Sequence, residues 1–198
     1  MIGYIKFAIQ KIFYVRLFYV YRKQASKDIK ISKNIEIDSS YSINIIQDKN
    51  TFNQLLNNGF SFDGYPNDQD INIGLDSGGI LIAIFYEKRI AHTSWLTNQD
   101  QSAIFDSIFK SSTFAGKNFG YIGPCNTYNN HKGKRLYPYA LQKACHLLLE
   151  FGNEAVLINT KKNNIPSIKG IIRAGFKPFV KVYKFRIFGL SKNILSKL

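Results

Sequence analysis

Apolar residues recur along the chain with two periods, one typical of strands and one typical of helices. Runs that alternate, or that are apolar over a strand's length, predict strands at 42–47, 71–76, 79–87, 89–97, 119–129, 155–160 and 176–189. Spacings of three and four residues predict helices at 51–59, 99–112, 135–151 and 165–175. Alternating strands and helices predict a mixed α/β domain.

Two of these elements have further local signals. In the helix 135–151, the apolar residues Leu141, Cys145 and Leu148 form one stripe, and Gly152 stands where a helix C-cap belongs. In the strand 119–129, Gly123 and Pro124 interrupt a regular ladder, because proline has no N–H to donate. We therefore expect a bulge or a splay at that point.

The first 24 residues are basic and aromatic rather than simply apolar. Lys11 and Arg16 interrupt the hydrophobic run and no small-residue cleavage site follows, which excludes a secretory signal. A spanning helix is excluded because each buried charge would cost about 2.5–3.5 kcal/mol near the bilayer centre. The segment either packs on the domain or lies against anionic lipid. We predict a basic N-terminal extension over residues 1–40 and one domain over residues 41–198.

The net charge of +14 is unevenly distributed. Residues 1–33 carry a net +7 and residues 155–198 a net +10, whereas residues 34–100 carry −6. This asymmetry indicates an anionic partner, namely a phosphate ligand, a membrane surface or nucleic acid, unless it only keeps the protein soluble. Two cysteines make no disulfide framework and are typical of a reducing, cytoplasmic compartment. No metal-ligand spacing is recognisable.

The stretch HKGKRLY at residues 131–137 places three cations directly before a predicted helix. The first N–H groups of a helix lack partners and the helix dipole is positive there, so such a start binds phosphate well. Neither a Walker A loop nor a G-x-G-x-x-G motif occurs. A nucleotide-binding P-loop and a dinucleotide fold are therefore excluded.

The order strand, basic loop, helix, strand, then NNIPSIKGIIRAGF (163–176) and a last strand, resembles the GNAT superfamily of acyltransferases over residues 42–187. The pyrophosphate loop of that family, Gln/Arg-x-x-Gly-x-Gly/Ala, falls on KGKRLY. Arg135 then replaces the central glycine and Tyr137 the final small residue. The second element, N-x-x-A/S before a helix that ends K-x-G-F, keeps its spacing at Asn164, Ser167 and Gly175.

The resemblance implies a GNAT-like, mostly antiparallel central sheet flanked by helices, with acetyl-CoA or another acyl-CoA as co-substrate and no metal. It implies that splayed strand residues bind the pantetheine amides through their backbone. It also implies that the basic loop and the helix start after it hold the pyrophosphate, and that a second helix start holds the far side of the ligand. The residues in these three positions are Cys125, Asn126 and Thr127; Lys132, Gly133, Lys134, Arg135, Leu136 and Tyr137; and Asn164 and Ser167. Because they all follow residue 124, a chain that begins near Ser42 is expected to keep its affinity for CoA.

The catalytic residues are less clearly marked. The usual proton donor of the family, a tyrosine, falls on Ile171. His92, near the end of a strand, is the candidate base because histidine titrates near neutrality, although a hydrogen-bonded strand histidine is the alternative. Tyr128, beside the splay, is the candidate proton donor, or an ordinary strand tyrosine.

The sequence thus predicts a cytoplasmic N-acyltransferase that acts on a primary amine, with contact at the inner face of the membrane left open. An amino sugar of a surface-glycan precursor, linked to a nucleotide or a lipid, is the expected acceptor. The alternative is a module that binds anionic lipid or nucleic acid and whose acyl-CoA site is degenerate.

Overall fold

The computed structural model describes residues 13–24, 34–64, 66–98, 118–187 and 190–197. The strands are β1 (Phe13–Gln24), β2 (Tyr41–Ile46), β3 (Ile80–Tyr86), β4 (Arg89–Asn98), β5 (Phe119–Thr127), β6 (Ala155–Lys161), β7 (Lys177–Ile187) and β8 (Leu190–Lys197). The helices are α2 (Lys49–Asn57), α3 (Asp68–Asp76), α5 (Leu136–Glu150) and α6 (Ile165–Arg173), with a 3₁₀ turn η2 (Asn129–His131). The predicted helix at 99–112 lies outside the described residues.

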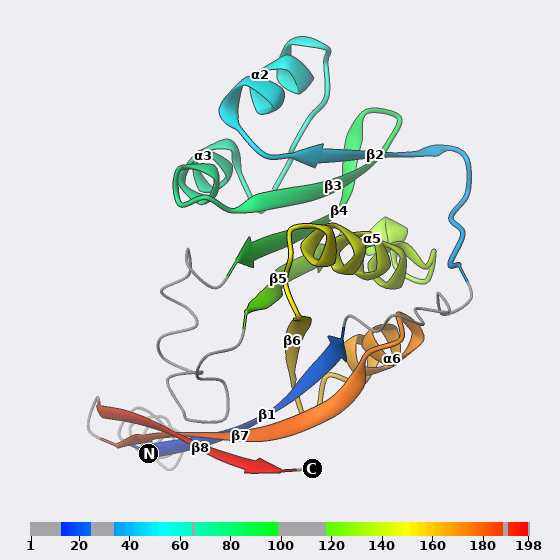
Figure 1. Ribbon diagram of the computed structural model, residues 1–198. Helices are drawn as coiled ribbons and strands as arrows, with labels where there is room; N and C mark the ends of the chain where they lie inside the picture. Colours follow the sequence, from blue (N-terminus) through cyan, green and yellow to red (C-terminus); the bar gives the residue numbers. More distant parts are fainter. Residues whose placement is uncertain (1–12, 25–33, 65, 99–117, 188–189, 198) are drawn as a thin grey trace, which may run out of the picture.

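All described strands belong to one sheet in the order β2-β3-β4-β5-β6-β1-β7-β8 (Figure 1). Every neighbouring pair is antiparallel except β5 and β6, which run parallel over four residue pairs. Helices flank this sheet, which confirms the predicted mixed, mostly antiparallel α/β architecture.

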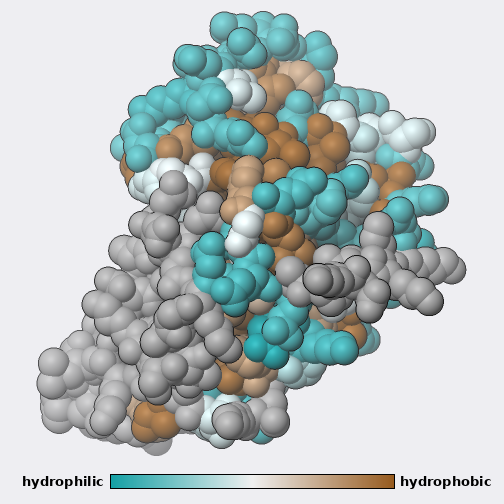
Figure 2. Space-filling view, in the orientation of Figure 1, coloured by the Kyte–Doolittle hydropathy of each residue, from teal (hydrophilic) through white to brown (hydrophobic). Residues whose placement is uncertain are grey.

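The strand β3 buries both of its faces, as the alternation of its side chains shows. Ile82 and Ile84 belong to a cluster with α5 and α6, whereas Leu81, Ala83 and Phe85 belong to a cluster with α2 and α3. Since successive side chains of a strand point to opposite faces, the two helix pairs lie on opposite faces of the sheet. The exposed side of α2 and α3 is mostly hydrophilic (Figure 2).

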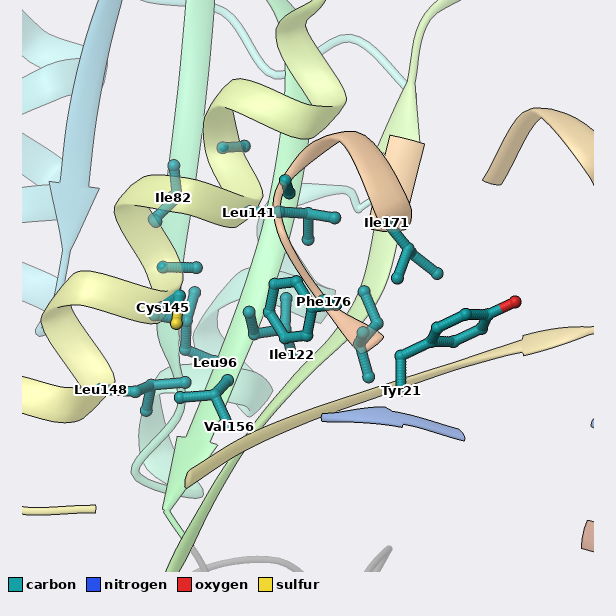
Figure 3. Packing of buried hydrophobic residues seen from close by; sticks show 14 of the residues in the cluster. Tyr21, Ile82, Leu96, Ile122, Leu141, Cys145, Leu148, Val156, Ile171 and Phe176 are labelled. Carbon is teal, nitrogen blue, oxygen red and sulfur yellow. The ribbon is translucent and has the colours of Figure 1, made fainter. Parts of the chain in front are cut away.

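The larger cluster lies beneath α5 and α6 (Figure 3). The helix stripe Leu141, Cys145 and Leu148, predicted from the sequence, meets strand residues such as Ile122 and Val156 there. The stripe therefore fixes α5 across β4 and β5, and this contact places the start of α5 at the ends of those strands. Gly152 follows α5 with a positive φ of 84°, as a C-terminal glycine does.

The strand β1 corrects the predicted domain boundary. Residues 1–40 were expected to form an extension outside the domain, but Phe13–Gln24 lies between β6 and β7 and pairs with both. Val20 and Tyr21 are buried on opposite faces of the sheet. Of the two interpretations left open, this part of the segment packs within the domain, and only distant pairing partners reveal it.

The segment 71–76 was predicted as a strand and is instead the second half of α3. The alternation of Ile71 and Ile73 imitates a strand, but only Ile71 is buried, together with Leu75 one helical turn later. Asn67 and Asp70 form a reciprocal capping box that starts the helix. The helix signal therefore lay upstream of the apolar residues.

The remaining predicted strands and helices within the described residues are confirmed, with boundaries that differ by at most two residues. Among the helices described, none is both long and apolar enough to cross a membrane.

Candidate functional site

The parallel contact between β5 and β6 opens halfway along β5. The ladder joins Phe119 to Ala155 and ends at Ile122 and Ile158, while the pairing of β5 with β4 continues to Thr127. Gly123 adopts a φ of 143° at the point of divergence, which an L side chain rarely tolerates. The predicted splay at Gly123 is thus confirmed, and it leaves a slot between the two strands.

A pocket of about 640 Å³ lies at the mouth of this slot. It brings together three segments that are distant in the sequence: the end of β5, the loop before α5, and α6. Ten of the eleven residues predicted to bind the ligand line it, namely Cys125, Asn126, Thr127, Lys132, Gly133, Arg135, Leu136, Tyr137, Asn164 and Ser167. Lys134 is the exception, because it lines a neighbouring cavity.

The start of α5 keeps a glycine-like backbone in spite of its side chains. Arg135 precedes the first helical residue with a φ of 62°, in the left-handed region. A non-glycine residue there costs about 1–2 kcal/mol. Gly133 also has a positive φ, and a Cβ at that position would meet no atom within 4 Å. The loop therefore follows the path expected of glycines, with the exposed Arg135 side chain added to it.

The rim of the pocket is cationic. Lys132 and Arg135 come from the loop, and Lys169 and Arg173 from α6. None of the described residues that line the pocket is a carboxylate. Such a rim, together with the positive ends of two helices, favours a phosphorylated ligand.

Four lining residues of α6 were not predicted as binding residues: Pro166, Lys169, Gly170 and Arg173. Their spacing of three, four and seven residues puts them on one face of the helix. Helix periodicity could therefore have identified them, because they continue the face of the helix that begins at Asn164 and Ser167.

Asn164 and Ser167 shape the start of α6. The Asn164 side chain accepts a hydrogen bond from the Ser167 backbone N–H, at 3.3 Å, and so caps the helix. The Ser167 hydroxyl lies 3.1 Å from the Tyr137 hydroxyl of α5. These contacts join the starts of the two helices on either side of the pocket.

Tyr137 closes the gap between α5 and α6. A Cβ at Gly170 would come within 2.5 Å of the Tyr137 ring, so the glycine allows this close approach. The ring also lies beside that of His92 on β4, with ring centroids 5.9 Å apart. Burial raises the pKa of Tyr137 well above its usual range, so its hydroxyl stays protonated. The ring therefore forms part of the pocket wall, directed towards α6 and β4.

His92 is buried beneath that wall. Its Nδ1 lies 2.7 Å from Thr127 Oγ1 and its Nε2 lies 2.8 Å from Ser94 Oγ. Burial lowers the pKa of His92 to about 3, so the ring is neutral and binds a proton poorly. These contacts agree with the hydrogen-bonded strand histidine and argue against the predicted role of a base exposed to substrate.

Tyr128 lies on the opposite face of the sheet. It packs against the cluster of α2 and α3, and its ring approaches Gly64 rather than the pocket. Burial, and then the nearby Asp63 carboxylate, raise the pKa of Tyr128. The residue predicted as proton donor is therefore not among those that line the pocket.

The other two histidines of the chain lie elsewhere. His131 lines the pocket and hydrogen-bonds through Nδ1 to the Tyr41 hydroxyl at 3.0 Å. His146 is exposed and pairs with Glu150 on the outside of α5. Within the described parts of the chain, no group of His, Cys, Asp and Glu is arranged to hold a metal ion.

The sequence as a whole matches no family model and no curated protein. Solved structures are similar in fold. An acetyltransferase of the GNAT family from Colwellia psychrerythraea has a TM-score of 0.56 at 13% identity, over 93% of this chain and 61% of that one. A GCN5-related N-acetyltransferase-like protein from Streptococcus suis has a TM-score of 0.54 at 15% identity, over 93% and 66%.

A GCN5-related N-acetyltransferase from Sphaerobacter thermophilus also has a TM-score of 0.54, at 14% identity, over 100% of this chain and 58% of that one. The chain thus spans between 58 and 66% of the length of these three proteins. It has the GNAT fold, which confirms the predicted resemblance at the level of architecture.

Proposed function

We propose that this protein transfers an acyl group from acyl-CoA, with acetyl-CoA as the first candidate, to a primary amine. One observation carries the proposal: the predicted ligand-binding residues of three separate segments line a single cationic pocket at the splay of β5 and β6. A volume of about 640 Å³ lies within the range of about 300–1,000 Å³ that small-molecule sites occupy.

The residues of the pocket fit the chemistry of CoA. Its pyrophosphate suits the start of α5 and the cations Lys132 and Arg135. Its pantetheine arm, which carries two amides, suits the strand end Cys125–Thr127 beyond the β6 ladder. The left-handed backbone of Arg135 preserves the loop's path, and the Tyr137 ring points to α6, so neither departure from the family motif fills the loop.

When bound, acyl-CoA supplies an acyl group activated as a thioester. The neutral amine nitrogen forms a bond to the acyl carbon, the carbon–sulfur bond breaks with its electron pair on the thiolate, and the amine loses one proton. Burial raises the pKa of the Cys125 thiol to about 12, and Tyr137 also stays protonated. In this proposal neither residue takes up the amine's proton, which leaves through solvent.

The acceptor that we propose is an amine on an anionic carrier, such as an amino sugar of a nucleotide- or lipid-linked surface-glycan precursor. The net charge of +14 supports an anionic carrier, because long-range attraction raises the encounter rate with such molecules. The proposal covers the described domain, whereas the solved structures of similar fold are longer chains.

Calorimetric titration of the full chain with CoA and acetyl-CoA tests the proposal. We expect saturable binding that weakens in Lys132→Ala, which removes a pocket cation, and not in Lys143→Ala, which removes an exposed cation from α5 that does not line this pocket. No binding of either ligand by the folded protein would contradict the proposal. Binding to anionic vesicles or single-stranded nucleic acid instead would favour the alternative module.

A further inference from the structure

Four side chains on β4 and β5 form one hydrogen-bonded chain. Thr127 Oγ1 lies 2.7 Å from His92 Nδ1, and His92 Nε2 lies 2.8 Å from Ser94 Oγ. Ser94 also hydrogen-bonds to the Cys125 thiol. The chain begins and ends on β5, at two residues that line the pocket.

These side chains share the face of the sheet that α5 covers. His92 pairs with Thr127 across the strands and Ser94 pairs with Cys125, and Ile84, the other cross-strand partner of His92, belongs to the cluster under α5. His92 and Ser94 are buried completely, and the Tyr137 ring covers the histidine. Water is therefore excluded from the middle of the chain.

The neutral imidazole gives the chain a direction. A neutral ring donates from one nitrogen and accepts at the other. The Ser94 hydroxyl can donate its single hydrogen either to the His92 ring or to the Cys125 sulfur, and sulfur is the weaker acceptor. This favours the direction in which Ser94 donates to Nε2 and Nδ1–H donates to Thr127 Oγ1. The hydrogen of the Thr127 hydroxyl is then available to an acceptor in the pocket.

We propose that Thr127 donates its hydroxyl hydrogen to a carbonyl oxygen of the acylated pantetheine arm, and that His92 is the positioning residue that fixes this direction. The inference rests on the proposed function, because it takes the ligand to be acyl-CoA. The carbonyl is either the thioester, where the bond would polarise the reacting group, or a pantetheine amide, where it would only hold the arm.

The direction of the chain can be measured without any ligand. Long-range ¹H–¹⁵N spectra of ¹⁵N-histidine-labelled protein report which ring nitrogen carries the proton, and the three histidines are assigned with His131→Gln and His146→Gln variants. We expect one neutral His92 ring with its proton on Nδ1. A proton on Nε2 would overturn the proposal, because Thr127 would then donate to the ring and not to the ligand.

The ligand is tested with Thr127→Val, which replaces the hydroxyl by a methyl group, and with Thr127→Ser, which keeps it. We expect Thr127→Val to lower either the CoA affinity or kcat about tenfold, which corresponds to about 1.4 kcal/mol of hydrogen bonding. We expect Thr127→Ser to restore most of that loss. A loss in CoA affinity identifies an amide as the acceptor, and a loss in kcat at unchanged CoA affinity identifies the thioester. The control is Thr97→Val, since the Thr97 hydroxyl is buried without a partner among the described residues and does not line the pocket.

His92→Leu tests the positioning role. If His92 acts only through Thr127, His92→Leu lowers the CoA affinity or kcat as much as Thr127→Val does. The double variant then shows no larger loss than either single variant. Additive losses would overturn the positioning role. If His92→Leu does not fold, the Thr127 pair and the spectra decide the proposal.

Two failures are distinguishable. If the folded parent protein binds no CoA or acetyl-CoA, the proposed function is wrong and the carbonyl acceptor is rejected with it. If the parent binds and turns over while Thr127→Val matches it in both CoA affinity and kcat, only the role of Thr127 and His92 is overturned.

Discussion

The two halves of the sheet differ in how the chain builds them. The half from β2 to β5 comes from residues 41–127 in sequence order, each strand pairing antiparallel with the next. The half from β6 to β8 combines residues 155–197 with β1, which lies more than a hundred residues earlier in the chain. In the hydrogen-bonded ladder of the described strands, the halves are joined by the four parallel pairs of β5 and β6.

The pocket lies at the seam of the two halves, which is the short parallel contact of β5 and β6. Each side of the seam lines the pocket with a different kind of side chain. The β4–β5 side contributes the neutral hydrogen-bonded chain of the buried His92 and Ser94 and the pocket-lining Cys125 and Thr127. The α6 side, which follows β6, contributes the exposed cations Lys169 and Arg173. A short parallel contact can diverge without breaking either half, so the seam is where a ligand can enter between strands.

The largest effect is expected from removal of β1, and it separates the two halves. A chain that begins at Ser42 lacks the strand between β6 and β7 and loses the burial of Val20 and Tyr21. We expect this truncated chain to lose cooperative unfolding in urea, as monitored by circular dichroism. This outcome differs from the prediction from sequence, which was that the truncated chain keeps its CoA affinity. In the full chain, Val20→Asp should destabilise strongly, because it buries an unpaired charge, whereas Gln24→Asp on the exposed end of β1 should not. A truncated chain that folds and binds CoA would show that β1 is dispensable.

The second effect tests the neutral side of the seam. In the folded protein the pKa of His92 is lowered to about 3, whereas in the unfolded chain it lies near 6.5, so the unfolded state binds the extra proton between these values. The contribution of His92 to stability is therefore fully present above about pH 6.5 and is lost as the pH falls towards 3. Between pH 7 and pH 5 the parent should lose about 2 kcal/mol of unfolding free energy that His92→Gln does not lose. Urea titrations of both proteins at the two pH values measure the difference, and parallel losses would mean that His92 is not buried and neutral.

The smallest effect tests the cationic side. Arg135→Ala should weaken CoA binding about tenfold, because a charge-assisted bond to phosphate is lost, and the loss should shrink as salt rises. Arg135→Gly should weaken binding similarly yet raise the unfolding free energy by up to about 1 kcal/mol, since glycine adopts the left-handed backbone without strain. Calorimetry and urea unfolding separate the two effects. Tighter CoA binding by Arg135→Gly would show that the arginine obstructs the loop.

Local patterns predicted most of the elements but not all of their partners. The stripe of Leu141, Cys145 and Leu148 predicted α5, because helix periodicity is a spacing of three and four residues that is visible within the segment itself. For β1, the basic and aromatic run Phe13–Gln24 carried no information about its pairing with β6 or β7. For α3, the capping residues Asn67 and Asp70 outweighed an apparent strand alternation.

The site shows the same division. Seven of the ten predicted residues that line the pocket belong to the starts of α5 and α6, where short motifs fix the backbone, and the other three follow the splay marked by Gly123 on β5. The roles proposed for His92 and Tyr128 depended instead on which way each side chain faces. His92 lies beneath the pocket and Tyr128 on the other face, and one residue of register decides such a choice in a strand.

The sequence alone determined most of the helices and strands, the cationic loop before α5 and the cap of α6, because each depends on residues within a few positions of one another. Only the tertiary structure decided that β1 completes the sheet, that Tyr137 reaches α6 and covers His92, and that a buried histidine joins Ser94 to Thr127. These features depend on contacts between distant segments, and their free energy comes from burial and hydrogen bonding that exist only once the whole sheet has formed.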